Sequence, residues 1–497
     1  MQNIVKRIRR DIVSEVVPTT RLDFAEQIST RLNNQIYLKR EDLTAVHSFK
    51  LRGAYHKIRS LNSAQLAKGV ITCSAGNHAQ GVAFSAKKLG ISATIVMPKI
   101  TPKIKTDAVK SLGGKVELFG NNYDEAYEFA QNIAKESGQS FIHAFDDIDI
   151  IAGQATIAYE LLEQLDDIDY IFVPVGGGGL ISGIASVIKT ERPQIKIIGV
   201  EPVDSAAMTR SIAKNSHIVL DEVGTFAEGV AVKKIGVENL RLAKSLVDET
   251  ILVSNDEMCA AIKDIYYQNR NIVEPSGALA LAGAKRYLQE KQLKSQNIIC
   301  IVSGANMNFD RLRYVAERAD LGEQNEAIFA VTIDEKLGSF LNFCQMLDNQ
   351  AITEFNYRYA HNQQAHIFVG VELTEGLSEK QALLSRLKKS YNVLDMSDNS
   401  IAKGHIRYMV GGRADVADEV LYRFEFPEQP GALLNFLQKI GNKWNISLFH
   451  YRNHGADFGR VLIGLQAKNT DKLEQSFDEL GYFYQNETQN SAYQYFL

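Results

Sequence analysis

The last third of the chain repeats itself, and this repeat limits the folds that the region can adopt. Residues 335–343 match residues 428–436 at an offset of 93, and residues 352–358 match residues 446–452 at an offset of 94. Each copy has the pattern of a strand, a glycine turn, an amphipathic helix and two alternating strands, followed by a second helix. We therefore expect two similar α+β modules of the ferredoxin-like type, at residues 327–399 and 420–492.

The chain before the repeat has a different pattern. Short β-branched runs alternate with helical stretches such as residues 80–89 and 106–112, and the runs lie at residues 70–72, 93–97, 170–175, 196–200 and 297–302. Near-continuous apolar strands between helices are typical of α/β layers around a mostly parallel sheet. We expect this α/β domain to span residues 1–321, with a polar linker at 321–326.

The bulk composition excludes several classes of protein. A formal net charge of −4 gives no general attraction to nucleic acid or to an anionic membrane surface. No apolar run approaches the ~20 residues that span a bilayer, and the basic residues 6–10 are followed by polar residues, unlike a secretory signal. The four widely spaced cysteines form no metal-binding motif. We therefore expect a cytoplasmic protein with free thiols.

A run of four glycines, residues 176–179, carries the first chemical signal. An apolar strand enters the run and a helical pattern follows it. Glycines let backbone N–H groups approach a ligand closely, and a helix N-terminus favours negative charge, so this loop can hold a phosphate. Ile181 and Ser182 exclude a Rossmann GxGxxG motif, and Ile184 after Gly183 excludes a Walker P-loop. By itself the loop could also be only a tight turn.

Three further segments complete the requirements of pyridoxal phosphate (PLP). Lys50 can form a Schiff base with an aldehyde, Asn77 can donate a hydrogen bond to a ring oxygen, and the hydroxyl of Ser303 can bond a pyridine nitrogen. A neutral hydroxyl at that position favours elimination over reactions that need a strong electron sink. The loop of residues 74–78 has the character of a carboxylate-binding nest. We expect His78 to be mainly structural, because Lys50 already supplies a base.

These motifs resemble those of the fold-type II PLP enzymes, and specifically of the threonine ammonia-lyase family. The resemblance rests on residues 39–42 and 48–54, on residues 74–78, on Lys105 with the prolines before it, and on the four glycines. It implies a catalytic region of two open α/β subdomains, like the tryptophan synthase β-subunit. The duplicated C-terminal modules resemble the tandem ACT-like regulatory domains of the biosynthetic form, which belongs to isoleucine synthesis.

The resemblance also implies roles for individual residues. Lys50 would be the catalytic residue and would carry PLP, and L-threonine would be converted to 2-oxobutanoate and ammonia, with L-serine as a further substrate. The cofactor-binding residues would be Lys50, Phe49, Asn77, Gly176, Gly177, Gly178, Gly179, Leu180 and Ser303, and the substrate-binding residues Ser74, Ala75, Gly76 and His78. Relatives with a divalent metal carry an acidic residue that the segment after Glu201 lacks, so we expect no metal.

Regulation and assembly are further implications of the resemblance. Isoleucine would inhibit the enzyme, valine would oppose isoleucine, and the chain would form a homotetramer. By the repeat alignment the effector residues would be Phe355, Tyr357, Phe449 and Tyr451. The same aromatic residues could instead pack on a sheet face, and the modules could serve assembly without a ligand. Other PLP enzymes, such as serine dehydratase or racemase, cysteine synthase and threonine synthase, and an inactive amino-acid sensor remain the alternative functions.

Overall fold

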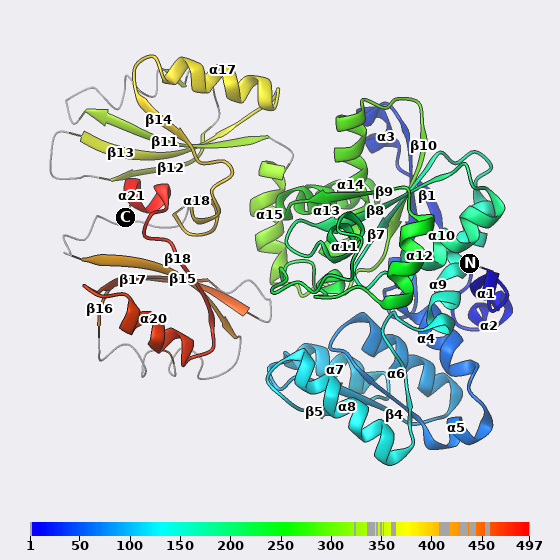
Figure 1. Ribbon diagram of the computed structural model, residues 1–497. Coiled ribbons are helices and arrows are strands. Elements are labelled where there is room, and N and C mark those ends of the chain that lie inside the picture. The colour runs from blue at the N-terminus through cyan, green and yellow to red at the C-terminus, as the bar shows by residue number, and fades with distance from the viewer. Residues whose placement is uncertain are drawn as a thin grey trace. The chain divides into compact units, whose positions relative to one another are not determined.

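The computed structural model describes residues 2–322, 325–334, 343, 346–347, 350, 352–358, 364–406, 418–427, 436, 444–452 and 458–496. The chain divides into two compact units, Met1–Asn308 and Phe309–Leu497. Figure 1 shows the first unit in blue to green and the second in yellow-green to red. Helix α15 (Arg311–Gly322), which the sequence analysis places at the end of the first domain, belongs to the second unit.

Two sheets form the first unit. The larger has the strand order β1-β2-β10-β7-β8-β9, in which β1 is antiparallel to β2 and the other pairs are parallel. The smaller is parallel throughout and has the order β5-β4-β3-β6. The strands are β1 (Leu22–Phe24), β2 (Gln35–Arg40), β3 (Val70–Cys73), β4 (Ala93–Met97), β5 (Lys115–Leu118), β6 (Ser140–Phe141), β7 (Tyr170–Pro174), β8 (Lys196–Pro202), β9 (Glu249–Val253) and β10 (Asn297–Val302). The two sheets, one mostly and one wholly parallel, confirm the predicted α/β architecture.

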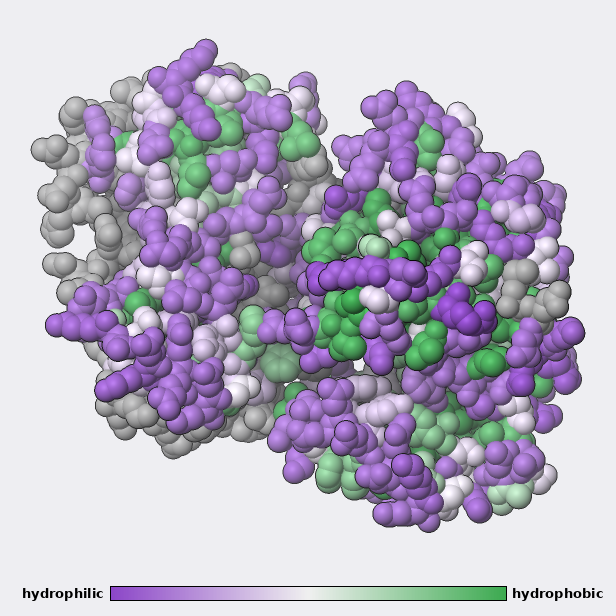
Figure 2. Space-filling view, in the orientation of Figure 1, coloured by the Kyte–Doolittle hydropathy of each residue, from purple (hydrophilic) through white to green (hydrophobic). Residues whose placement is uncertain are grey.

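The helices of the first unit cover these sheets (Figure 1). They are α1 (Gln2–Val5), α2 (Arg10–Ser14), α3 (Glu26–Leu32), α4 (Lys50–Arg59), α5 (Ser63–Lys68), α6 (Asn77–Leu89), α7 (Lys103–Ser111), α8 (Tyr123–Ser137), α9 (Ile148–Gln164), α10 (Gly179–Glu191), α11 (Ala207–Ala213), α12 (Val237–Leu246), α13 (Asn255–Asn269) and α14 (Pro275–Lys291), with 3-10 turns η1 (Glu41–Leu43) and η2 (Glu228–Val230). On the face seen in Figure 2, hydrophilic residues cover much of this unit, with hydrophobic patches between them. No helix in the described part of the chain is long and apolar enough to cross a membrane.

The second unit contains the predicted repeat as two four-stranded antiparallel sheets, ordered β12-β13-β11-β14 and β16-β17-β15-β18. After α15, the elements are β11 (Glu326–Asp334), β12 (Ile352–Arg358), β13 (Gln364–Glu372), α17 (Leu377–Leu387), β14 (Asn392–Asp395), α18 (Ser400–Gly404), β15 (Glu419–Pro427), β16 (Asn445–Arg452), β17 (Phe458–Gln466), α20 (Asp471–Asp478), β18 (Phe483–Asn486) and α21 (Ser491–Phe496). The register shifts once in each copy, between Ile352 and Glu354 and between Ile446 and Leu448. The helices expected after Gly338 and Gly431 lie mostly outside the described residues.

The two repeats pack against each other within the second unit. Ile328 and Phe368 of the first copy share a buried apolar cluster with Leu421 and Leu462 of the second. Asn399 and Asn490, which lie at equivalent positions before α18 and α21, are joined by a side-chain hydrogen bond of 3.1 Å. The duplicated modules therefore form one body with a shared core.

Candidate active site

Lys50 is the first residue of helix α4, and its side chain is partly buried. Its Nζ donates a hydrogen bond to the carbonyl oxygen of Ala144 at 2.9 Å and lies 5.2 Å from the centre of the Phe49 ring. Burial lowers the pKa of Lys50 to about 8, and the negative charge of Glu274 opposes this shift. More of this amine is therefore unprotonated near neutral pH than on an ordinary lysine, which makes it a better nucleophile and base.

Ser303 and Asn77 lie where strands of the two sheets end. Ser303 follows β10, and its carbonyl accepts a hydrogen bond from the N–H of Phe49 at 3.1 Å, which joins this strand end to the residue before Lys50. Asn77 begins helix α6, after β3. Because the carboxyl ends of parallel strands are the usual place for a ligand in such sheets, these positions fit a cofactor site.

Glu274 connects these two residues, and the sequence analysis missed it. Its Oε1 accepts hydrogen bonds from Asn77 Nδ2 at 2.7 Å and from Ser276 Oγ at 2.9 Å. The hydroxyl of Ser303 donates to the carbonyl of Ser276 at 3.0 Å. A serine hydroxyl has one proton, so donation to a pyridine nitrogen requires it to leave that carbonyl. A carboxylate directly before Pro275, at the start of an apolar helix, was the signal in the sequence.

The amide of Asn77 has a fixed orientation. Its oxygen accepts from Asn306 Nδ2 at 2.8 Å while its nitrogen donates to Glu274. An amide nitrogen has two hydrogens, so one remains for a ring oxygen. The arrangement leaves a donor for the role that the sequence analysis expects for Asn77, and that role stays a prediction.

The glycine loop forms a cradle that side chains would fill. A Cβ on Gly177 would lie 2.1 Å from the Phe145 ring, and one on Gly176 would lie 2.8 Å from Val230. Gly178 has a φ of 91°, which favours glycine, and no described side chain caps the helix that begins at Gly179. The N–H groups at this helix start therefore suit the phosphate of PLP, as the family resemblance requires.

The expected substrate loop lies between β3 and α6. Ser74 Oγ accepts a hydrogen bond from the N–H of Gly76 at 3.3 Å, and a Cβ on Gly76 would meet nothing within 4 Å. The side chain of His78 does not belong to this open loop: it is buried, and its Nε2 lies 3.0 Å from the carbonyl of Ile142. Burial, with a smaller contribution from Lys50, lowers the pKa of His78 to about 3. Its imidazole is therefore neutral at physiological pH.

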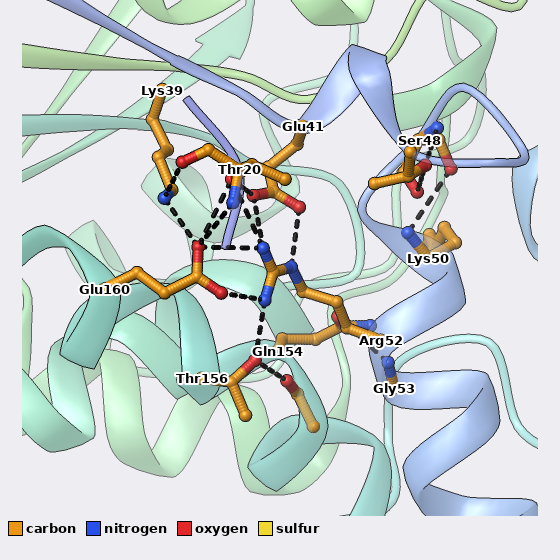
Figure 3. A network of polar contacts seen from close by, with 12 residues as sticks. Thr20, Lys39, Glu41, Ser48, Lys50, Arg52, Gly53, Gln154, Thr156 and Glu160 are labelled. Atoms are coloured by element: carbon orange, nitrogen blue, oxygen red, sulfur yellow. Dashed lines mark hydrogen bonds and ion pairs between the residues drawn. The ribbon is translucent and has the colours of Figure 1, made fainter. Parts of the chain in front are cut away.

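A buried charge network fixes helix α4 behind Lys50 (Figure 3). Arg52 donates to Glu41 at 2.7 and 2.9 Å and to Glu160 at 2.6 and 3.0 Å. Lys39 donates to Glu160 at 2.6 Å. The network ties the end of β2 to α4 and α9, and its two cations match its two carboxylates. It gives a structural reason for Lys39 and Glu41 in the motif at residues 39–42, which the sequence analysis used only as a signature.

Glu201, at which we expect no metal, is already bonded. Its carboxylate accepts hydrogen bonds from the N–H groups of Met208 and Thr209, both at 2.8 Å, and from the Thr209 hydroxyl at 2.6 Å. Burial raises the pKa of Glu201 to about 7. The described residues contain no group of three or more His, Cys, Asp or Glu that could hold a metal ion. The absence of a metal stays a prediction.

The four expected effector residues lie on equivalent strands. Phe355 and Tyr357 pair with Val369 and Ile367 across β12 and β13. Phe449 and Tyr451 pair with Ile463 and Val461 across β16 and β17. Their backbone positions follow the repeat, and their side chains lie outside the described residues.

Comparison with known proteins shows the family of the chain. Residues 13–304 match the family described as pyridoxal-phosphate dependent enzyme, and residues 317–406 and 410–497 match the C-terminal regulatory domain of threonine dehydratase. The chain is 52% identical to a biosynthetic L-threonine dehydratase of Pasteurella multocida over 99% of this chain and 97% of the relative.

Solved structures resemble about two thirds of the chain. Threonine deaminase isoform 2 of Solanum lycopersicum, in its processed form, has a TM-score of 0.63 and 46% identity, over 64% of this chain and 89% of that one. Maize serine racemase has a TM-score of 0.60 and 33% identity, over 63% and 96%. The C-terminal part of this chain matches the regulatory domain twice, and the chain belongs to the threonine dehydratases, a family of pyridoxal-phosphate-dependent enzymes.

Proposed function

We propose that the chain converts L-threonine to 2-oxobutanoate and ammonia, with Lys50 as the catalytic residue. The observation that carries this proposal is the partly buried Lys50 amine, which donates to a neutral carbonyl and has no ion pair with a described carboxylate. Bound PLP supplies an electron-withdrawing ring that makes the Cα proton of an amino acid removable. The Nζ of Lys50 holds the cofactor's aldehyde between turnovers and takes the Cα proton during them.

The other residues hold and orient the reactants. Phe49 lies beside the cofactor, Asn77 donates to the ring oxygen, and Ser303 faces the pyridine nitrogen. Gly176 to Leu180 bind the phosphate through backbone N–H groups. Residues 74–78 bind the substrate carboxylate, with His78 contributing its backbone because its imidazole is turned to Ile142. The neutral Ser303 favours loss of the β-hydroxyl: the electron pair left at Cα forms the Cα–Cβ double bond, and the hydroxyl leaves with the Cβ–O bonding pair.

A lysine substitution tests the central role. We expect Lys50→Ala to lower kcat by more than the ~10²–10⁴-fold typical of a lost general base, because the covalent link is lost as well. The visible absorption of the bound cofactor should disappear with it. Lys57→Ala is the matched control on the same helix, since Lys57 pairs with Asp147 and Asp149. A Lys50→Ala protein that kept both colour and turnover would contradict the proposal.

Substrate choice has one serious alternative. The 33% identity to maize serine racemase makes racemisation in the same site the alternative reaction. We propose that L-serine is deaminated as a second substrate. Keto-acid formation from each amino acid, with D-serine measured in parallel, separates the two reactions. D-serine formed faster than either keto acid would favour a racemase.

The regulatory unit leads to a second part of the proposal. Isoleucine inhibits the enzyme, valine opposes isoleucine, and the chain acts in isoleucine synthesis as a cytoplasmic homotetramer. Couplings of this kind are typically worth ~1–3 kcal/mol. The support is the regulatory-domain match together with the duplicated sheets. Isoleucine titration of full-length Phe355→Ala and Phe449→Ala would test the pockets, and an unchanged half-inhibitory concentration in both would exclude these positions.

A further inference from the structure

Asn239 lies behind the glycine loop, on the first turn of helix α12, and is fully buried. Its Nδ2 donates two hydrogen bonds, to the carbonyl oxygen of Gly177 at 2.9 Å and to that of Phe145 at 3.0 Å. Both hydrogens of the amide are therefore used on backbone carbonyls. This one side chain joins the glycine loop to the segment whose Ala144 carbonyl accepts from Lys50.

The carbonyl of Gly177 has a second donor from the same direction. The N–H of Gly236, which precedes α12, donates to it at 3.1 Å. The C=O and N–H of a trans peptide point in opposite directions. Holding the Gly177 carbonyl toward α12 therefore turns the N–H of Gly178 away from α12. Without these donors, the loop of four glycines would have many orientations open to that peptide.

The close approach of Asn239 is built into the neighbouring glycines. A Cβ on Gly178 would lie 2.8 Å from the Asn239 Cβ, and a Cβ on Gly236 would lie 2.6 Å from its Nδ2. Asp146 fixes the start of α12 by accepting from the N–H groups of Val237 and Glu238 at 2.8 and 3.1 Å. The side chain is thus held from both sides.

The oxygen of the Asn239 amide has a different environment from the nitrogen. Asn239 Oδ1 is buried and has no hydrogen-bond partner among the described residues. An unpaired buried acceptor is costly. The fold accepts this cost while both N–H hydrogens of Asn239 are bonded to carbonyls. The loop therefore requires the two donors of this side chain and not its oxygen.

We propose that Asn239 is a positioning residue for the cofactor phosphate: it sets the Gly177–Gly178 peptide so that the Gly178 N–H faces the phosphate. The inference rests on the proposed assignment of this loop to the PLP phosphate. It extends that assignment to a residue that does not touch the cofactor. It also separates phosphate binding from the chemistry at Lys50.

The test compares PLP with pyridoxal, which has the aldehyde but no phosphate. Dissociation constants of both are measured by absorbance on the apoprotein of the full chain. Asn239→Asp is nearly isosteric and replaces two donors with an acceptor facing two carbonyls. We expect its PLP dissociation constant to rise about 10- to 100-fold. The constant for pyridoxal should change less than threefold.

Two further variants complete the design. Asn215→Asp is the matched control, since it adds the same charge at an exposed residue that already accepts from Lys244. Asn239→Thr keeps one hydroxyl donor and should lose less PLP affinity than Asn239→Asp, which keeps the inference testable if the aspartate variant does not fold. Urea unfolding of each apoprotein identifies folded protein.

The outcomes separate this inference from the proposed site. An equal loss for PLP and pyridoxal, or no loss for either, would overturn the role of Asn239. A wild-type protein that binds pyridoxal as tightly as PLP would instead overturn the assignment of the glycine loop to the phosphate.

Discussion

Two lysines of the first unit, the buried Lys39 and the partly buried Lys50, have opposite environments. Lys39, on β2, donates to the carboxylate of Glu160 at 2.6 Å and to the side-chain oxygen of Gln164 at 2.8 Å. Lys50, on α4, donates to a single carbonyl at 2.9 Å. Burial lowers the pKa of both, but Glu41 and Glu160 oppose the shift at Lys39, whereas only Glu274 does so at Lys50.

The difference shows how burial can serve structure or reactivity. A buried cation with a carboxylate on it stays charged and holds elements together. A buried amine without such a partner gives up its proton more readily and can act as a nucleophile or base. The network around Arg52 therefore stabilises the helix on which the reactive lysine lies.

Removing the centre of the network should have the largest effect. In Arg52→Met, Glu41 and Glu160 stay buried with only Lys39 between them, and the free energy of unfolding should fall by about 3–5 kcal/mol. Urea unfolding of the apoprotein measures it. Arg59→Met on the same helix is the control, because Arg59 is half exposed and its ion pair is 3.9 Å long, so its effect should stay within about 0.5 kcal/mol. Equal effects of the two substitutions would mean that the network adds nothing.

Removing the reactive lysine should instead raise the free energy of unfolding of the apoprotein. An amine with a folded-state pKa of about 8 costs stability wherever it is charged in the fold. Lys50→Met should therefore raise the free energy of unfolding of the apoprotein by about 1–3 kcal/mol at pH 7, while abolishing activity.

The pH dependence of that gain follows from the direction of the shift. Between pH 8 and 10.5 the unfolded chain binds the proton and the folded chain does not, so wild-type stability rises relative to Lys50→Met. The difference between the two proteins should narrow by about 1 kcal/mol from pH 7 to pH 9. A difference that stayed constant over this range would show that burial does not shift the Lys50 pKa.

The fold class and the reactive lysine could be predicted from the sequence, but the side-chain partners of the buried charges could not. The strands at residues 93–97 and 297–302 have the predicted bounds, because each is a nearly continuous apolar run. The repeat predicted both antiparallel sheets. Motifs also identified the family, since Lys50 and the glycine loop lie in short local patterns.

The residues that the sequence analysis missed act over long separations. Glu160 meets Arg52 from another helix, Glu274 meets Asn77 across the two sheets, and Asn239 reaches back to Gly177. None lies in a local motif, and each type of residue is common on solvated helices. Only the packing reveals that these polar side chains are buried, which is why their partners could not be predicted.

The rate of cofactor capture gives a third way to compare the lysines. If the Lys50 amine attacks the aldehyde of PLP only when unprotonated, the capture rate of the apoprotein should rise about tenfold per pH unit below pH 8 and level off above it. Stopped-flow absorbance follows the reaction. The remaining slow reaction of Lys50→Ala, through surface lysines, should keep rising toward pH 10. A wild-type rate that also rose to pH 10 would show that the pKa of Lys50 is that of an ordinary lysine.

The smallest effect is expected at His78, a third buried base. Burial and the neighbouring charge of Lys50 lower its pKa to about 3, so the imidazole cannot change its charge between pH 6 and 9. His78→Gln keeps a donor for the Ile142 carbonyl and should lower kcat/KM by less than about tenfold, since loss of a general base typically costs 10²–10⁴-fold. The pH profile of kcat/KM should keep its shape. If the pH profile of His78→Gln lost one of its pH-dependent limbs, His78 would share the proton transfer with Lys50. The contrast between a lysine paired with a carboxylate and one without such a partner would then no longer explain the site.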